Sequence, residues 1–458
     1  MTRSRLMRAV IALVAVVGMA VLAATLVPDA TAVASAKQAP VLVLRVHAPT
    51  AKAFKALRKN YDLLEKRSGD DYFVLGDAAV QKSLKAKGYR VSVADTLAPL
   101  SPAPTSTLRA AATYATFYGG YHTAAAQQQH LRDVAATYPT LATVVDYGDS
   151  WLKTKNRGGN DLLAICITKK NAGDCALNPN VPKPRSVLYA AIHARELATA
   201  EIAWNWIDYL TQGYGTNAAV TSLLDTTELW VIPVANPDGR QIVESGGNSP
   251  YYQRKNADDA RGNCRRPPTS SNQYGVDMNR NATFHWGGVG STNTACAQEY
   301  RGTSAASEPE TAAQQALFNN LFKDQRGPNI TDAAPATATG TFISYHSYAS
   351  LTLYPWGDTT NAAPNKTKLK ALADRMVAAS GSGYTTGQGP SILYGTSGTT
   401  DDDMYGRLGV ASFTTELGAA NTSCDGFMPP YSCVGSRFWP QEQKALMVLA
   451  QAAAGPYR

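Results

Sequence analysis

His193 and Glu196 stand three residues apart, directly after the apolar run from Val187 to Ile192. The helical pattern that begins at Leu197 would place both residues on the first turn of a helix, where side chains at this spacing point to the same side. They could hold one metal ion, although such a pair more often lies on a solvent-exposed helix face. The chemistry therefore depends on a third ligand, a base and a substrate clamp elsewhere in the chain.

His346 is the candidate for the third ligand. It ends the apolar stretch Thr341 to His346, which predicts a strand, and strands of α/β sheets present functional side chains at their C-terminal ends. Of the four histidines besides His193 and His346, one lies in the front segment and three have no carboxylate or histidine at ligand spacing. Two histidines and a glutamate with an open fourth position form a catalytic zinc site. We therefore expect one zinc ion per chain, bound by His193, Glu196 and His346.

Glu416 is the candidate for the base that a zinc-bound water needs. It is the lone carboxylate at the end of a second apolar run, Val410 to Glu416. Burial disfavours a charge at such a position unless a metal or a proton compensates it. The alternative is a carboxylate at a sheet edge in contact with solvent.

The first 36 residues predict export. Arg3, Arg5 and Arg8 precede an apolar run from Ala9 to Val27 and then the small-residue sequence Ala34-Ser-Ala. This pattern is typical of a signal peptide, and a membrane-spanning anchor is the alternative. We expect a secreted, extracellular monomer with no stable membrane anchor after signal cleavage.

Six cysteines agree with secretion, because disulfides persist in oxidising compartments. They fall as three close pairs, but six cysteines allow 15 connectivities, among which the sequence does not choose. None lies in a Cys-x-x-Cys pattern, so a cysteine zinc site has no support. We expect nearest neighbours to pair: Cys166 with Cys175, Cys264 with Cys296, and Cys424 with Cys433.

A front segment, residues 37–111, differs from the rest of the chain. Its pattern predicts a small α/β unit, and a Pro/Ser/Thr/Ala-rich linker with Arg109 follows. A small unit, a cleavable linker and a large domain form a zymogen layout, with a permanent accessory domain as the alternative. The unit's expected elements are strands at 41–46, 72–75 and 89–93, a helix carrying Phe54, Leu57, Tyr61 and Leu64, and a helix at 79–87.

Charge is concentrated in this front segment. Residues 37–111 carry 13 Lys and Arg against 6 Asp and Glu, whereas residues 112–458 have a net charge close to zero, out of a total of +8. A nucleic-acid partner would require basic residues around a groove in the main domain. We therefore expect no nucleic-acid function.

The main domain alternates strands and helices from Thr113 to the C-terminus, which predicts an α/β fold. Two long polar stretches, 246–279 and 287–307, exceed the length of simple connections and are typical of functional loops. The expected strands are 143–147, 162–168, 186–192, 228–233, 341–346 and 410–416, and the expected helices are 124–138, 197–210, 309–322, 366–380 and 440–454.

Several motifs follow one another in order along the main domain: His193-Ala-Arg-Glu196, Asn236-Pro-Asp-Gly239, Arg254, Gly275-Val-Asp-Met-Asn279-Arg280-Asn281, His346-Ser-Tyr348, and Tyr394 to Glu416. In these motifs the main domain resembles the zinc metallocarboxypeptidase family, the relatives of pancreatic carboxypeptidases A and B, and it looks like a secreted bacterial member. The likeness covers about residues 113–456. It implies a mixed, twisted β-sheet flanked by helices for a catalytic domain at 112–458, after a signal peptide at 1–36 and a propeptide-like unit at 37–111. Cys264 and Cys296 also look like a disulfide of the family.

The resemblance implies a role for each motif residue. Glu416 would act as the base, and Arg254 would stabilise the developing oxyanion. A clamp on the substrate's free C-terminal carboxylate would consist of Asn279, Arg280 and Tyr394, and Arg195 would add a second cation to the cleft. Taken singly, Arg280 could instead pair with Asp277, Tyr394 could belong to the core, and Asn281 could cap a turn.

Residue preference depends on Asp401, seven residues after Tyr394. A-type family members have an apolar pocket residue here and B-type members an aspartate, so Asp401 predicts a preference for Lys or Arg, or for mixed basic and apolar C-terminal residues. Three consecutive aspartates, Asp401 to Asp403, leave a one-residue shift open, and Asp403 replaces the family's tryptophan. The separation of Glu196 and His346 is longer than expected for animal members of the family, which we attribute to additional loop residues within 287–329.

The sequence therefore predicts a secreted zinc metallocarboxypeptidase, an exopeptidase that acts on the C-termini of peptides and proteins. One alternative is a zinc amidase of the same fold that acts on cell-wall peptides or amino-acid conjugates. Another is a secreted binding module with an inactive site, which the presence of all three ligands and Glu416 disfavours.

Overall fold

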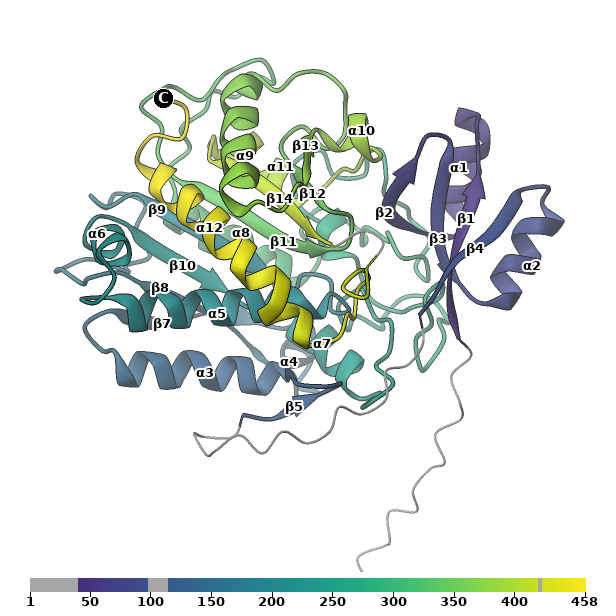
Figure 1. Ribbon diagram of the computed structural model, residues 1–458, viewed down its shortest axis with the longest axis horizontal. Coiled ribbons are helices and arrows are strands. Elements are labelled where there is room, and N and C mark those ends of the chain that lie inside the picture. Colours follow the sequence, from purple (N-terminus) through teal and green to yellow (C-terminus); the bar gives the residue numbers. More distant parts are fainter. Residues whose placement is uncertain (1–39, 98–113, 419–421) are drawn as a thin grey trace, which may run out of the picture. The chain divides into compact units, whose positions relative to one another are not determined.

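The computed structural model describes residues 40–97, 114–418 and 422–458, except for the side chain of residue 65. The predicted signal peptide and the linker with Arg109 lie outside these residues. Figure 1 colours the chain along its sequence, with the front unit (40–97) in purple to blue and the main domain from residue 114 in blue to yellow.

The front unit is a four-stranded antiparallel sheet with two helices, and its strand order is β2-β3-β1-β4. The expected helix through Leu64 is wrong at its C-terminal end, because α1 ends at Asn60 and the chain continues as a strand. Leu63 faces the core beneath the helices, whereas Leu64 packs on the opposite side of the sheet. The elements are β1 (Val41–His47), α1 (Ala51–Asn60), β2 (Asp62–Ser68), β3 (Asp71–Gly76), α2 (Ala78–Ala86) and β4 (Arg90–Leu97).

The main domain is built on an eight-stranded mixed sheet in the order β13-β12-β14-β11-β9-β10-β8-β7. Its central strands β10, β9, β11 and β14 run parallel. Strands β7 and β8 pair antiparallel with their neighbours, and β12 pairs antiparallel with β14 but parallel with β13. The predicted α/β fold with a mixed sheet is confirmed. The strands are β7 (Ala142–Asp149), β8 (Asp161–Ile167), β9 (Arg185–Ala190), β10 (Glu228–Ile232), β11 (Thr341–Ser347), β12 (Leu351–Leu353), β13 (Thr385–Gly387) and β14 (Ala411–Leu417), and a separate pair comprises β5 (Thr116–Phe117) and β6 (Tyr121–His122).

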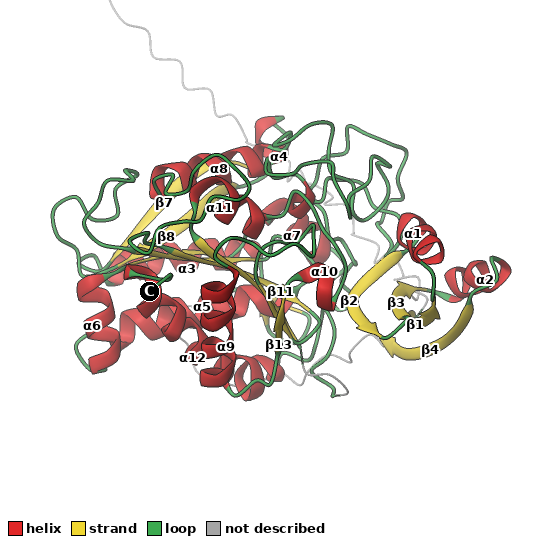
Figure 2. Ribbon diagram, turned by 90° about the horizontal axis from the view of Figure 1, so that it is seen from above, coloured by secondary structure: helices red, strands yellow, loops and turns green. Residues whose placement is uncertain are grey.

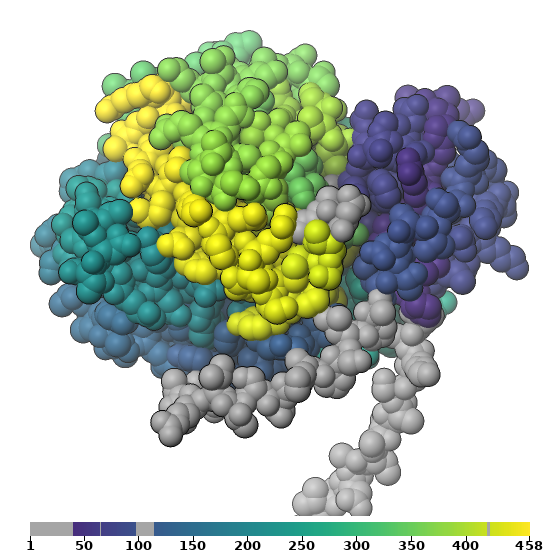
Figure 3. Space-filling model, viewed as in Figure 1, coloured from purple at the N-terminus to yellow at the C-terminus, as the bar shows by residue number. Residues whose placement is uncertain are grey.

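Helices cover both faces of this sheet (Figure 2). Consecutive strand residues face opposite sides, so Leu188 belongs to the core on one face and Val187 to the core on the other. The C-terminal helix α12, yellow in Figure 3, lies beside α9 on the surface. On one face are α3 (Ala124–Thr137), α5 (Leu197–Gly213), α9 (Lys366–Ser380) and α12 (Trp439–Gln451), and on the other are α8 (Pro309–Leu321) and α11 (Thr400–Leu408).

Several short elements within the predicted connections have no counterpart among the predictions. Those of five residues or fewer are too short for apolar periodicity to reveal them. The elements without a counterpart are α4 (Trp151–Thr154), α6 (Ala218–Thr226), α7 (Pro237–Glu244), α10 (Gly389–Ile392) and short 3-10 or π turns at Met278–Arg280 and Val434–Phe438, whereas the expected helix 440–454 ends in a 3-10 turn at Ala452–Ala454.

Three disulfides confirm the pairing of nearest neighbours, Cys166–Cys175, Cys264–Cys296 and Cys424–Cys433. The Cys264–Cys296 bond joins the two long loops that the sequence marked as functional. Within residues 40–97, 114–418 and 422–458, no helix combines the length and apolar character needed to cross a membrane.

Candidate active site

His193, Glu196 and His346 meet where the parallel strands β9 and β11 end. His193 and Glu196 lie in a tight turn before α5, which begins only at Leu197, so their expected place on the first helical turn is wrong. The turn forms because the chain must leave β9 before it enters the helix, and Glu196 N–H donates to the His193 carbonyl at 3.2 Å. The three-residue spacing still brings the two side chains together, since His193 Nδ1 lies 2.7 Å from Glu196 Oε1.

The buried ligand atoms fit a cation. His346 Nδ1 lies 3.1 Å from His193 Nδ1 and 3.2 Å from Glu196 Oε2, and one atom from each of the three residues lies within 4.8 Å of the others. Burial raises the pKa of Glu196, but the two imidazoles lower it and the net shift is downward. Burial also lowers the pKa of His346, which favours the neutral imidazole that a metal requires.

The outer nitrogens of both imidazoles face oxygen atoms. His193 Nε2 lies 3.3 Å from Asp277 Oδ1, and His346 Nε2 lies 2.9 Å from Ser344 Oγ. A neutral imidazole has one donor and one acceptor nitrogen, so a proton on Nε2 leaves a lone pair on Nδ1. Two such lone pairs and a carboxylate then converge, an arrangement that a divalent cation such as zinc satisfies.

Asp277 supports this centre, although the sequence suggested it only as a partner of Arg280. Its Oδ2 accepts a hydrogen bond from Arg254 Nε at 3.0 Å and forms an ion pair with Arg254 Nη2 at 3.0 Å. Burial raises the pKa of Asp277, but the charges of Arg254 and Arg280 outweigh this and hold it well below its usual range. A carboxylate inside the Gly275–Asn281 motif was the available signal. Asp277 therefore orients both a metal ligand and a nearby cation.

Replacing Asp277 with Asn should weaken zinc binding by about 10- to 100-fold, because the imidazole of His193 loses its anionic partner. Competition with a zinc chelator measures this change. Asp259→Asn is the matched control, since Asp259 pairs with Arg157 and Arg266 on the surface. An unchanged zinc affinity in the Asp277 variant would contradict the proposed support.

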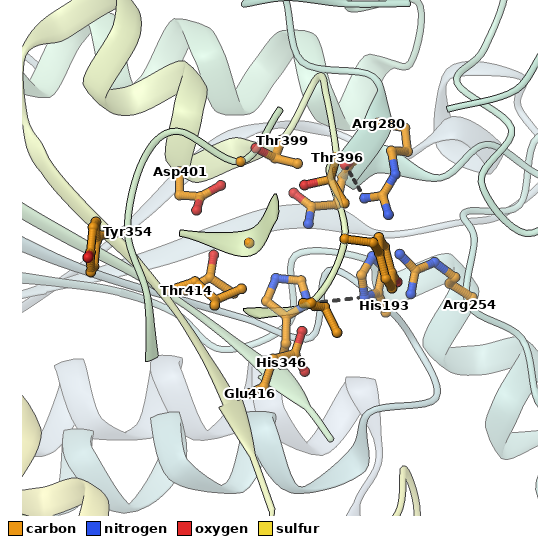
Figure 4. A pocket seen from close by; sticks show the side chains of 16 residues that line it. His193, Arg254, Arg280, His346, Tyr354, Thr396, Thr399, Asp401, Thr414 and Glu416 are labelled. Atoms are coloured by element: carbon orange, nitrogen blue, oxygen red, sulfur yellow. Dashed lines mark hydrogen bonds between the residues drawn. The ribbon is translucent and has the colours of Figure 1, made fainter. Parts of the chain in front are cut away.

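Glu416 lies directly beside the third ligand. Strands β11 and β14 are parallel neighbours, and His346 and Glu416 are register partners. Both side chains line one pocket together with His193 (Figure 4). Glu416 is buried rather than exposed at a sheet edge, and the apolar sequence of β14 explains this placement.

The residues expected to clamp the substrate carboxylate, Asn279, Arg280 and Tyr394, line the same pocket, and so does Arg254, the residue expected to stabilise the oxyanion. Arg280 donates from Nε to the Gly290 carbonyl and from Nη1 to the Asn279 carbonyl, both at 2.8 Å. Asn279 Oδ1 accepts from Thr400 N at 3.0 Å and from Thr400 Oγ1 at 3.1 Å, which fixes the amide orientation. Arg280 is therefore held by hydrogen bonds to backbone carbonyls, whereas Arg254 is held by the carboxylate of Asp277.

Asp401 also lines this pocket. In Figure 4 its side chain lies away from those of Arg254 and His193. Asp402 accepts from Gly357 N–H instead, and its pKa is raised by burial and by the charge of Asp401. Asp403 pairs with Arg407 at 2.7 Å. Of the three consecutive aspartates, Asp401 is the one that reaches the pocket, so the departure from the family's tryptophan at Asp403 lies outside it.

Arg195 does not line the pocket in the described chain. Its Nη1 donates to Asp62 Oδ2 of the front unit at 2.8 Å, and its guanidinium lies 3.9 Å from the centre of the Phe427 ring. Arg195 was predicted to add a cation to the cleft, but Asp62 of β2 holds its guanidinium while the front unit is present.

Comparison with known proteins tests this interpretation. The family model described as zinc carboxypeptidase matches residues 127–439. The chain belongs to the zinc carboxypeptidase family. As a family member, it is a metallocarboxypeptidase, which confirms the enzyme class predicted from the motifs.

Relatives of this zinc carboxypeptidase include fungal and animal proteins. Carboxypeptidase A2 of Mus musculus is 30% identical over 318 residues, which cover 68% of this chain and 66% of the relative. A metallocarboxypeptidase A-like protein of Trichophyton verrucosum is 27% identical over 329 residues, covering 70% and 68%. The crystal structure of the carboxypeptidase A from Helicoverpa armigera has the same fold, with a TM-score of 0.68, 22% identity and coverage of 90% of this chain and 97% of that one.

Proposed function

We propose that this chain is secreted and removes the C-terminal residue from peptides and proteins, with one zinc ion held by His193, Glu196 and His346. The observation that carries the proposal is the lining of a single pocket. The ligand histidines, Glu416 and the residues suited to bind a carboxylate face it together. Recognition of a free carboxylate would make the reaction an exopeptidase one.

Each residue of the pocket has its own role in the proposed reaction. When bound, zinc polarises the scissile carbonyl and lowers the pKa of a bound water. Glu416 takes a proton from the attacking water and passes it to the leaving amine. Arg254, oriented by Asp277, stabilises the negative charge that develops on the carbonyl oxygen. The free carboxylate of the substrate is bound by Asn279, Arg280 and Tyr394.

Asp401 supports a preference for Lys or Arg at the C-terminus of the substrate. The same pocket is also lined by Leu353, Tyr354 and Leu393, so apolar residues would be accepted too. A buried carboxylate stabilises a cationic side chain and disfavours an anionic one.

Peptides that end in Arg, Leu or Phe test the function and the preference in one assay. Mass spectrometry should show loss of a single C-terminal residue, fastest for Arg. Asp401→Asn should lower the ratio of kcat/KM for Arg over Leu by about tenfold or more. Asp403→Asn is the matched control, since Asp403 lies outside the pocket. A wild-type protein that favours Leu or Phe would contradict the role of Asp401.

We also propose that the front unit is an inhibitory propeptide, released when the linker around Arg109 is cut. Asp62 holds Arg195, and Val43, Leu64 and Phe73 pack against Tyr348 and Phe427 of the main domain. These contacts cover side chains beside the metal ligands. The three disulfides support secretion of the assembled protein.

Cleavage of the linker should raise peptidase activity at least about tenfold, because the front unit then dissociates from the cleft. The comparison uses the purified long form and the same protein after proteolysis near Ala110, with the N-terminus determined by mass spectrometry. If the long form is equally active, the front unit is not inhibitory.

A further inference from the structure

Thr399 is the N-cap residue of helix α11, but its hydroxyl does not cap the helix. A threonine at this position usually accepts a hydrogen bond from a backbone N–H of the first turn. Thr50 and Thr123 do so at the starts of α1 and α3, where they accept from Ala53 N–H and Ala126 N–H, both at 3.1 Å. In the described part of the chain, the side chain of Thr399 accepts no such bond from α11.

The hydroxyl of Thr399 is buried and unpaired. The residue is 3% exposed, and its Oγ1 has no hydrogen-bond partner among residues 40–97, 114–418 and 422–458. A buried hydroxyl without a partner costs free energy, and valine would fill the same space without that cost. The extended backbone at this position (φ −90°, ψ 156°) also suits valine. Packing of the free chain therefore does not explain the hydroxyl, whereas a bound ligand would.

Thr399 lines the pocket that contains Asp401. Ser412 Oγ donates to the Asp401 carbonyl at 2.6 Å, which fixes the first turn of α11 against strand β14. Thr414 lines the same pocket from this strand, on the face that also carries Glu416, since alternate residues of a strand share a face. Figure 4 shows the side chains of Thr399, Asp401 and Thr414 among those around the pocket.

The pocket therefore offers one carboxylate and threonine hydroxyls to the C-terminal side chain of the substrate. We propose that Thr399 is a further specificity-determining residue, whose hydroxyl accepts a hydrogen bond from the guanidinium of a C-terminal arginine while Asp401 binds its other N–H groups. A guanidinium presents five donors in a planar fork, whereas the ammonium of lysine is compact and has three. The pocket then selects Arg over Lys, a distinction that the charge of Asp401 does not make by itself. The inference rests on the proposed function.

Three peptides that differ only in their C-terminal residue, Arg, Lys or Leu, test this role. The assay uses zinc-loaded protein that folded as the full chain and was then cut at the linker. We expect kcat/KM of the wild type to be about tenfold higher for Arg than for Lys, the effect of one hydrogen bond to a charged group. Thr399→Val should bring this ratio close to one, and Thr399→Ser, which keeps a hydroxyl, should keep it well above one. Any loss of folded protein cancels in the ratio.

Thr311→Val is the matched control. Thr311 of α8 is also buried, its Oγ1 also lacks a partner within the described residues, and it lies outside the pocket. Its Arg-to-Lys ratio should remain as in the wild type. Both valine variants should unfold at a temperature no lower than the wild type, because each removes an unpaired buried hydroxyl.

Equal rates for the Arg and Lys peptides in the wild type, or an unchanged ratio in Thr399→Val, would overturn the role of Thr399. A lower unfolding temperature of that variant together with an unchanged ratio would assign the hydroxyl to the fold instead. In all of these cases the C-terminal residue is still released, so the proposed function stands. If none of the three peptides loses its C-terminal residue, the proposed function and the role of Thr399 both fail.

Discussion

Glu416→Gln should lower kcat/KM for a C-terminal peptide substrate by about 10²- to 10⁴-fold, the range expected for loss of a general base. Glutamine has nearly the same shape but cannot accept a proton at the reacting position. Glu416 lies beside the proposed zinc ligands without belonging to them, so zinc content should remain one ion per chain. Steady-state kinetics and metal analysis of the same sample measure both quantities.

Glu442→Gln provides the matched control for this result. Glu442 is also buried, and it accepts a hydrogen bond from Tyr345 Oη at 2.8 Å on the neighbouring strand, away from the pocket. Its loss should affect the free energy of unfolding more than kcat/KM. Near-normal hydrolysis by the Glu416 variant would show that another group acts as the base.

His346→Ala should remove both zinc and activity. Two of the three ligands remain, and the loss of the ion eliminates several kcal/mol of transition-state stabilisation, which corresponds to a decrease of more than about 10⁴-fold. Metal analysis should find well under one zinc per chain after dialysis, and added zinc should restore little activity. Chelator-treated wild type, in contrast, should recover when zinc is returned.

His130→Ala separates metal loss from general damage. His130 is a buried histidine that pairs with Asp208 at 2.8 Å and stacks on Trp204, remote from the ligand cluster. We expect the variant to be less stable but to keep its zinc. Stoichiometric zinc in the His346 variant would mean that the metal is held by other residues.

The metal ligands and Glu416 could be predicted because each follows or ends an apolar run. The C-terminal ends of parallel strands meet at one edge of a sheet, so His346 and Glu416, distant in sequence, become register partners. The order of the motifs then supplied Arg254, Asn279 and Arg280, which the structure brings to the same pocket. The alternation of strands and helices was sufficient for the α/β class.

What could not be predicted depends on tertiary contacts. Tyr61 and Leu64 continue the helical stripe of Phe54 and Leu57, yet the chain forms a strand there, because Leu63 and Leu64 pack on opposite faces of the front sheet. Asp277 lies in a loop without periodicity, where only the folded chain shows that it faces His193 and Arg254. Arg195 was expected in the cleft, but its partner Asp62 belongs to a different part of the sequence.

The most direct test of the central claim compares a peptide with a free C-terminal carboxylate and the same peptide with a C-terminal amide. Both are incubated with the zinc-loaded, linker-cleaved protein, and the products are identified by mass spectrometry. A site that binds the carboxylate through Asn279, Arg280 and Tyr394 should shorten the free acid by one residue and leave the amide nearly intact. Cleavage of both peptides at internal bonds, or equal processing of acid and amide, would contradict a carboxypeptidase function.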